Sequence, residues 1–128
     1  MINRILKLFL ILFVLSCEEV EIEKRDYPYI FMKSVEQVNE GKLLVAEVMD
    51  KGSSTVKSYG FVWNSNGSPN MEEDSVLIVL PTSEFGEGEF NAVIESGQLE
   101  KFNFVYVRPY VETDDNLIYG NEVFASVK

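Results

Sequence analysis

Hydrophobic and polar residues alternate one by one in short stretches of this chain, and that pattern most limits its possible folds. Between residues 89 and 95, for example, Phe90, Ala92 and Ile94 lie on one face, opposite Glu89, Asn91 and Glu95. A period of two residues is that of a β-strand with one buried face. After Tyr27 there is no sustained 3.6-residue period, and clusters of Gly, Asn, Asp and Ser separate the stretches. The sequence therefore predicts an all-β domain.

Seven strands are expected, and their spacing is typical of an immunoglobulin-like β-sandwich. They are predicted at residues 27–35, 42–49, 56–63, 75–80, 87–95, 103–112 and 118–127. Alternation divides the sixth strand into a core face and an opposite face. The core face is Val105, Val107, Pro109 and Val111, and the opposite face is Phe104, Tyr106, Arg108 and Tyr110.

Charge and residue types exclude several classes of function. The 128 residues, enough for one domain, include 21 Asp and Glu against 11 Lys and Arg, a formal net charge of −10. Nucleic-acid binding requires a basic surface and is not expected. The chain has no histidine, which removes imidazole metal ligands and His-dependent nucleophiles. We therefore expect a non-enzymatic protein with no metal and no cofactor.

Residues 1–16 have the features of a secretory signal peptide. Arg4 and Lys7 precede an uninterrupted hydrophobic run over residues 8–15. The run is too short for a transmembrane helix, which needs ~20 hydrophobic residues. Residues 14–17, Val-Leu-Ser-Cys, resemble a bacterial lipobox, in which the cysteine is lipidated and becomes the new N-terminus. The resemblance implies that Cys17, the one cysteine of the chain, anchors the protein to a membrane through lipid.

Residues 17–26 form an acidic segment that we expect to be a linker. Glu18, Glu19, Glu21 and Glu23 come directly after Cys17. The segment resembles the acidic tract that marks lipoproteins of Bacteroidota-like bacteria for surface display. We therefore expect the protein at the outer membrane, facing outward. A position on the periplasmic face, with a linker that is merely solvated, is the alternative.

Four segments of the domain expected at residues 27–128 resemble fibronectin type III-like repeats of extracytoplasmic Bacteroidota proteins. They are Tyr59-Gly60-Phe61-Val62-Trp63, Gly88-Glu89-Phe90, Tyr106-Val107-Arg108-Pro109-Tyr110 and Tyr119-Gly120-Asn121-Glu122-Val123. The resemblance implies a fibronectin type III-like sandwich with a binding or spacer role rather than a catalytic one. The chain departs from the family at Pro109, where a small residue is usual. Because proline has no N–H, we expect an edge position or a bulge there.

Four residues form the candidate binding surface. Tyr106, Arg108 and Tyr110 share one strand face, and the family pattern places Phe124 outward beside them. Arginine flanked by aromatic residues is typical of interface hot spots, and exposed rings also stack on sugars. The alternative is a cross-strand ladder that only stabilises the sheet. Trp63 could also offer a ring to a ligand, but we expect it in the core.

Two acidic clusters, residues 72–74 and 114–116, could supply oxygen ligands to Ca²⁺. Neither has the spacing of an EF-hand, and the second is expected to be a tight turn capped by its own side chains. The polar loop at residues 64–70 could carry binding residues, but we expect a solvated connection.

The sequence favours a lipid-anchored module of the cell envelope that binds a protein or glycan partner. One alternative is a structural accessory subunit of a larger outer-membrane complex. Another is a hydrolase with two catalytic carboxylates, although no spacing in the sequence selects such a pair.

Overall fold

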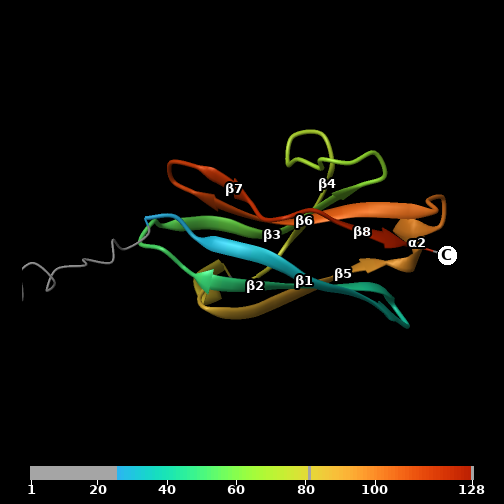
Figure 1. Cartoon of the computed structure of the whole chain (residues 1–128), viewed down its shortest axis with the longest axis horizontal. Coiled ribbons are helices and arrows are strands. Elements are labelled where there is room, and N and C mark those ends of the chain that lie inside the picture. Colours follow the sequence, from blue (N-terminus) through green and yellow to red (C-terminus); the bar gives the residue numbers. More distant parts are fainter. Residues whose placement is uncertain (1–25, 81, 128) are drawn as a thin grey trace, which may run out of the picture.

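The computed structural model describes residues 26–80 and 82–127, which fold into two facing antiparallel β-sheets (Figure 1). One sheet has three strands in the order β1-β2-β5, and the other has five, in the order β4-β3-β6-β7 with β8 also paired to β6. The predicted immunoglobulin-like β-sandwich is confirmed. The predicted signal peptide, Cys17 and the acidic linker up to residue 25 lie outside the described residues.

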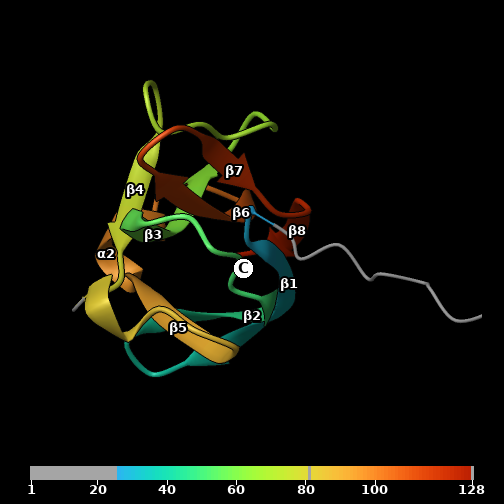
Figure 2. The ribbon, with the colours of Figure 1, turned by 90° about the vertical axis from the view of Figure 1, so that its left-hand side faces the viewer.

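The elements follow the predicted pattern closely. The strands are β1 (Tyr29–Val38), β2 (Gly41–Asp50), β3 (Val56–Asn64), β4 (Ser75–Ile78), β5 (Gly88–Glu95), β6 (Phe104–Thr113), β7 (Leu117–Tyr119) and β8 (Val123–Ser126). The short helices are η1 (Thr82–Glu84) and α2 (Ser96–Leu99). Figure 2, turned by 90°, shows the sheets as separate layers, with α2 at their margin. No helix in this part of the chain has the length and hydrophobicity to span a membrane.

The described residues form eight strands rather than seven, because the predicted strand at residues 118–127 is interrupted. Its first part, β7, pairs with residues 110–112 of β6, and its last part, β8, pairs with residues 104–107. Gly120 lies in the interruption, where a β-carbon would be 2.5 Å from Cγ of Pro109. Glycine therefore lets the chain pass close to the proline ring.

Pro109 lies in the middle of a central strand, so the predicted edge position or bulge was wrong. Pairing of β6 with β3 continues past Pro109 without a register shift. The Pro109 carbonyl accepts a hydrogen bond from the N–H of Gly120 at 2.9 Å. In an antiparallel ladder the N–H and carbonyl of one residue point to the same side. The position of the missing proline N–H therefore faces Gly120, at the interruption between β7 and β8, and the ladder to β3 does not need it.

The inward faces of the two sheets form one hydrophobic core, as alternation predicted. Its buried residues include Leu44, Ala46, Phe90, Ile94, Val105, Val107 and Val111. The aromatic residues of β3 lie between the layers: the Phe90 ring is 5.1 Å from Tyr59 and 5.2 Å from Phe61, measured between ring centroids. Trp63 is 4% exposed, which confirms its expected place in the core.

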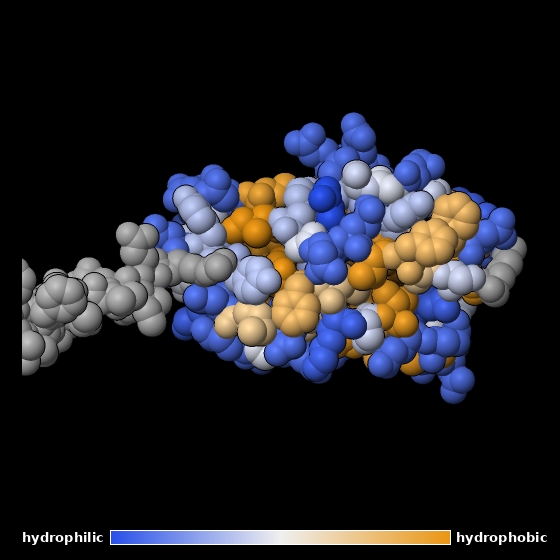
Figure 3. All heavy atoms as spheres, viewed as in Figure 1, coloured by the Kyte–Doolittle hydropathy of each residue, from blue (hydrophilic) through white to orange (hydrophobic). Residues whose placement is uncertain are grey.

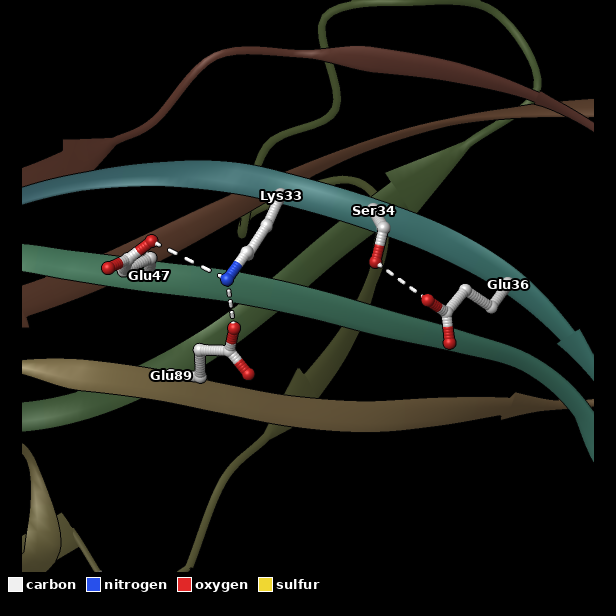
Figure 4. A network of polar contacts seen from close by, with 5 residues as sticks. All are labelled: Lys33, Ser34, Glu36, Glu47 and Glu89. Atoms are coloured by element: carbon white, nitrogen blue, oxygen red, sulfur yellow. Dashed lines mark hydrogen bonds and ion pairs between the residues drawn. The ribbon is translucent and has the colours of Figure 1, made fainter.

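The outer face of the three-stranded sheet carries an ionic network that crosses all three strands (Figure 4). Lys33 lies at a register shift in β1, and its ammonium donates a hydrogen bond to Glu89 on β5. The same ammonium is 4.0 Å from a carboxylate oxygen of Glu47 on β2. The hydrogen bond to Glu89 and the negative charge of Glu89 raise the pKa of Lys33.

A backbone-to-side-chain hydrogen bond links the two sheets. The N–H of Met32 in β1 donates to Asn121 Oδ1 at 2.8 Å.

Candidate binding surface

The outer face of β6 holds three of the four candidate residues. One of the three, Tyr110, is fully buried. Its expected exposure was wrong. Tyr110 lies opposite Gly60 of β3 in the register, and its hydroxyl forms a 2.7 Å hydrogen bond with the hydroxyl of Ser58. The side chain therefore reaches across to β3, where Gly60 has no side chain to occupy the space. Burial raises the pKa of Tyr110, the bond to Ser58 lowers it in part, and the charge of Glu112 adds to the rise.

Arg108 is half-buried and held by groups of the same domain. Its Nε donates a hydrogen bond to the carbonyl of Pro69 at 2.6 Å. Its guanidinium carbon lies 3.8 Å from the centroid of the Tyr119 ring, within the range of a cation–π contact. Arg108 is therefore engaged in fastening a loop to the sheet instead of projecting into solvent as expected.

That loop, residues 65–74 between β3 and β4, is fastened to the outer face at further points (yellow-green in Figure 1). The N–H of Ser68 donates to the carboxylate of Glu122, and the N–H of Met71 donates to the Tyr119 hydroxyl at 3.0 Å. Pro69 is fully buried. The β3–β4 loop is therefore part of the fold, which differs from the solvated connection expected from its composition.

Side chains at the two ends of the β3–β4 loop fix its shape. Asn64 donates through Nδ2 to Asp74 Oδ2 at 3.1 Å, and its Oδ1 accepts from the N–H of Gly67 at 2.9 Å. Asp74 also accepts from the N–H of Asn70 at 2.9 Å. One acid of the first acidic cluster thus stabilises the loop. Within residues 26–80 and 82–127, no group of three or more Cys, Asp or Glu residues is arranged to hold a metal ion.

The second acidic cluster lies between β6 and β7, which confirms the predicted turn. The N–H of Thr113 donates to the carbonyl of Asn116 at 2.7 Å. The N–H of Asn116 in turn donates to the Thr113 hydroxyl at 3.0 Å. The side chain that caps the turn is therefore that of Thr113, whereas the sequence pointed to the Asp and Asn residues.

The other half of the outer face of β6 is open. Phe104 and Tyr106 of β6 meet Phe124 of β8, and these three residues are called the aromatic cluster. The Phe124 ring centroid lies 5.1 Å from that of Phe104 and 5.3 Å from that of Tyr106. Phe104 is 40% exposed and Phe124 is 59% exposed. Figure 3 shows hydrophobic side chains at the surface in the region where Figure 1 draws β8.

The structure thus keeps two of the predicted site residues together, Tyr106 and Phe124, and separates them from Arg108 and Tyr110. Phe104 was missed as a site residue, although the alternation that selected Tyr106 also places Phe104 on the same face. Tyr119 was missed as well. Its hydroxyl and ring hold the β3–β4 loop and Arg108, and no local sequence pattern indicates contacts with such distant residues.

No protein-family model matches the sequence, and a search of curated proteins finds no match.

Proposed function

We propose that this protein is a lipid-anchored, non-enzymatic module of the cell envelope that binds a partner protein through the aromatic cluster. The observation that carries the proposal is a cluster of three aromatic rings on one sheet face, in which Phe104 and Phe124 are exposed and Tyr106 is half-buried. Grouped exposed hydrophobic side chains mark interaction sites in soluble domains. Aromatic residues are also the commonest anchors of protein interfaces.

The arrangement of the rings favours a protein over a glycan as the partner. Phe104 and Tyr106 stand at 88° to each other, and Tyr106 and Phe124 at 62°. Rings packed edge to face form an uneven projection instead of the flat platform on which a sugar stacks. A hydrophobic pocket on another protein fits such a projection better.

The position of the aromatic cluster suits a tethered domain. Asp26 is the first described residue, and its carbonyl accepts the Ser54 hydroxyl at 2.6 Å and the N–H of Ser53 at 3.2 Å. Cys17 lies nine residues earlier in the sequence. An extended segment of that length reaches about 30 Å. Figure 1 places the start of β1 toward one end of the long axis and β8 toward the other, so an anchor at Cys17 leaves the aromatic cluster accessible.

Lipidation is tested by Cys17→Ser. The proposal expects the wild-type chain to partition into the detergent phase and to carry a mass increase at Cys17, because acyl chains dominate its membrane affinity. The Cys17→Ser chain should appear in the aqueous phase or remain unprocessed. A variant that still partitions with the detergent would contradict the assignment.

Partner binding is tested by a photo-crosslinking phenylalanine analogue placed at position 124 in living cells. A matched control places it at position 78, because Ile78 is 56% exposed on the outer face of the same sheet. We expect a protein adduct from position 124 and none from position 78. Equal adducts from both positions, or adducts that contain carbohydrate and no protein, would overturn the proposal.

The accessory-subunit alternative uses the same surface permanently, and the same experiment separates the two. A binding module gives an adduct whose yield follows the supply of its partner. An accessory subunit gives one constant, stoichiometric adduct with an envelope protein.

Protease treatment of intact cells tests on which side of the outer membrane the domain lies. The chain carries a tag after Lys128, and a periplasmic protein serves as the control. Loss of the tag alone supports outward display, and protection of the tag supports the periplasmic face.

A further inference from the structure

A pocket lies at the end of the sandwich where β3 ends, β4 begins and α2 leads into β6, and we propose that it binds a neutral saccharide unit. The pocket has a volume of about 590 Å³. Pockets that take small ligands span roughly 300–1,000 Å³. It is separate from the aromatic cluster, and the inference goes beyond the proposed function because it names a second ligand.

Two parts of the chain that are far apart in the sequence, residues 63–75 and residues 97–102, supply its polar groups. Hydroxyl and amide groups come from Ser65, Ser75 and Gln98, and charged groups come from Glu73 and Lys101. The β3–β4 loop that carries Ser65 and Glu73 is held in shape by the hydrogen bonds of Asn64 and Asp74 described above. Because the loop is already held in one shape, little conformational entropy is lost when a ligand binds to its side chains.

Trp63 lines this pocket, and its indole supplies a donor with nothing to bond. The indole Nε1 is buried and has no hydrogen-bond partner in the described part of the chain. A buried tryptophan N–H usually finds an acceptor, so a site beside it gains from a ligand oxygen. The half-buried Phe102 ring stands edge-on to Trp63 at 5.8 Å between centroids.

The mixed charges select the class of ligand. An anion placed beside Lys101 would also meet Glu73 and Asp74, which would repel it. A cation attracted by those carboxylates would meet Lys101. A neutral ligand with many hydroxyls pays neither cost, because each hydroxyl can both donate and accept. It can accept from Lys101 and the indole N–H, and it can donate to Glu73 and the Gln98 carbonyl. A saccharide unit has this chemistry.

Trp63 is the one tryptophan of the chain, so its fluorescence reports on this pocket alone. The full chain is titrated with glucose, galactose, mannose, N-acetylglucosamine, maltose and cellobiose. It is kept in a polyoxyethylene detergent, because glucoside detergents would compete. We expect a saturable change in emission with at least one of these, with a Kd of about 1 mM or lower. Glucuronate and glucosamine, which add one charge of either sign, should bind at least about tenfold more weakly.

Matched variants locate the effect. Lys101→Ala and Glu73→Gln should each raise the Kd about tenfold, since each removes a hydrogen bond with a charged group. Lys57→Ala and Glu36→Gln change exposed residues outside the pocket and should leave the Kd unchanged. Thermal unfolding of each variant confirms that it is folded. Phe124→Ser should also leave the titration unchanged, which separates this inference from the proposed function.

Three results would each overturn the inference. The first is an unchanged emission with every neutral saccharide up to about 10 mM, well above the expected Kd. The second is equal binding of the charged analogues. The third is a Kd that responds to the control variants as much as to the pocket variants.

Discussion

Tyr106 and Tyr110 occupy the same face of the same strand, yet their surroundings are opposite. Tyr110 is fully buried and bonded to Ser58, whereas Tyr106 belongs to a cluster whose neighbour Phe124 is 59% exposed. Both residues satisfy the same alternation in the sequence. The comparison shows that the period of a strand decides which side of the sheet a residue faces, and that distant segments decide whether that side is covered.

The covered half of the outer face of β6, around Arg108 and Tyr110, is built from small residues and long-range contacts. Gly60 leaves space beside Tyr110, and a β-carbon at Gly60 would lie 1.9 Å from the Leu77 carbonyl oxygen on the neighbouring strand. Arg108 is held by Pro69 and Tyr119, which are distant from it in the sequence. In the open half, ring contacts join the members of the aromatic cluster, and large fractions of Phe104 and Phe124 stay exposed.

The largest expected effect is that of Tyr110→Ala on stability. Removal of a fully buried aromatic ring leaves a cavity and should lower the free energy of unfolding by about 3–5 kcal/mol. Urea denaturation monitored by circular dichroism measures the change. The matched variant Phe124→Ala should cost less than about 1 kcal/mol, because that ring is largely exposed. Equal losses from the two variants would remove the distinction between the halves.

Arg108→Met should have an intermediate effect. It removes the hydrogen bond to Pro69 and the contact with Tyr119, for an expected loss of about 2 kcal/mol in the free energy of unfolding. Hydrogen exchange of the Ser68 and Met71 amides should also become faster, because the β3–β4 loop loses an anchor. Lys57→Met is the control, since Lys57 is exposed. Unchanged exchange at both amides would show that Arg108 does not hold the loop.

Tyr110→Phe tests the hydrogen bond and the ionisation of the covered half. At neutral pH the lost bond to Ser58 should cost about 1 kcal/mol in the free energy of unfolding. Burial raises the pKa of Tyr110 in the folded state, so ionisation favours unfolding. The stability contributed by the neutral hydroxyl is present below about pH 10, the unfolded value, and is lost as the pH rises through the folded pKa.

Because the phenylalanine variant cannot ionise there, the stability difference between it and the wild type should shrink as the pH rises above about 10. Urea titrations at several alkaline pH values measure this. Lys33, whose pKa is also raised, is present in both proteins and cancels in the difference. A difference that stays constant across this range would contradict the burial of the hydroxyl.

The smallest effect on stability is expected from Phe124→Ser, at or below about 1 kcal/mol in the free energy of unfolding. Association with the proposed protein partner should nevertheless be lost, as measured by pull-down with the partner identified from the crosslink. Ile78→Ser, which changes a residue of similar exposure, should keep association. A large loss of stability with association intact would instead favour the cross-strand ladder as the role of the aromatic cluster.

The sequence determined the class of fold, the place of each strand to within a few residues, and the side of the sheet on which residues of the fifth and sixth predicted strands lie. The exception was the last strand, which Gly120 and Pro109 divide through a contact that the alternation cannot indicate. The sequence also placed Trp63 in the core. These features follow from local periodicity and turn residues, which act between neighbours in the chain.

Tertiary structure alone decided which outward residues are available for binding. The β3–β4 loop is polar in composition, yet it becomes part of the outer face through Arg108, Tyr119 and Glu122. The polar groups around Trp63 likewise come from segments that only the fold brings together. The physical reason is that exposure depends on every segment that packs over a residue, while alternation describes only the strand that carries it.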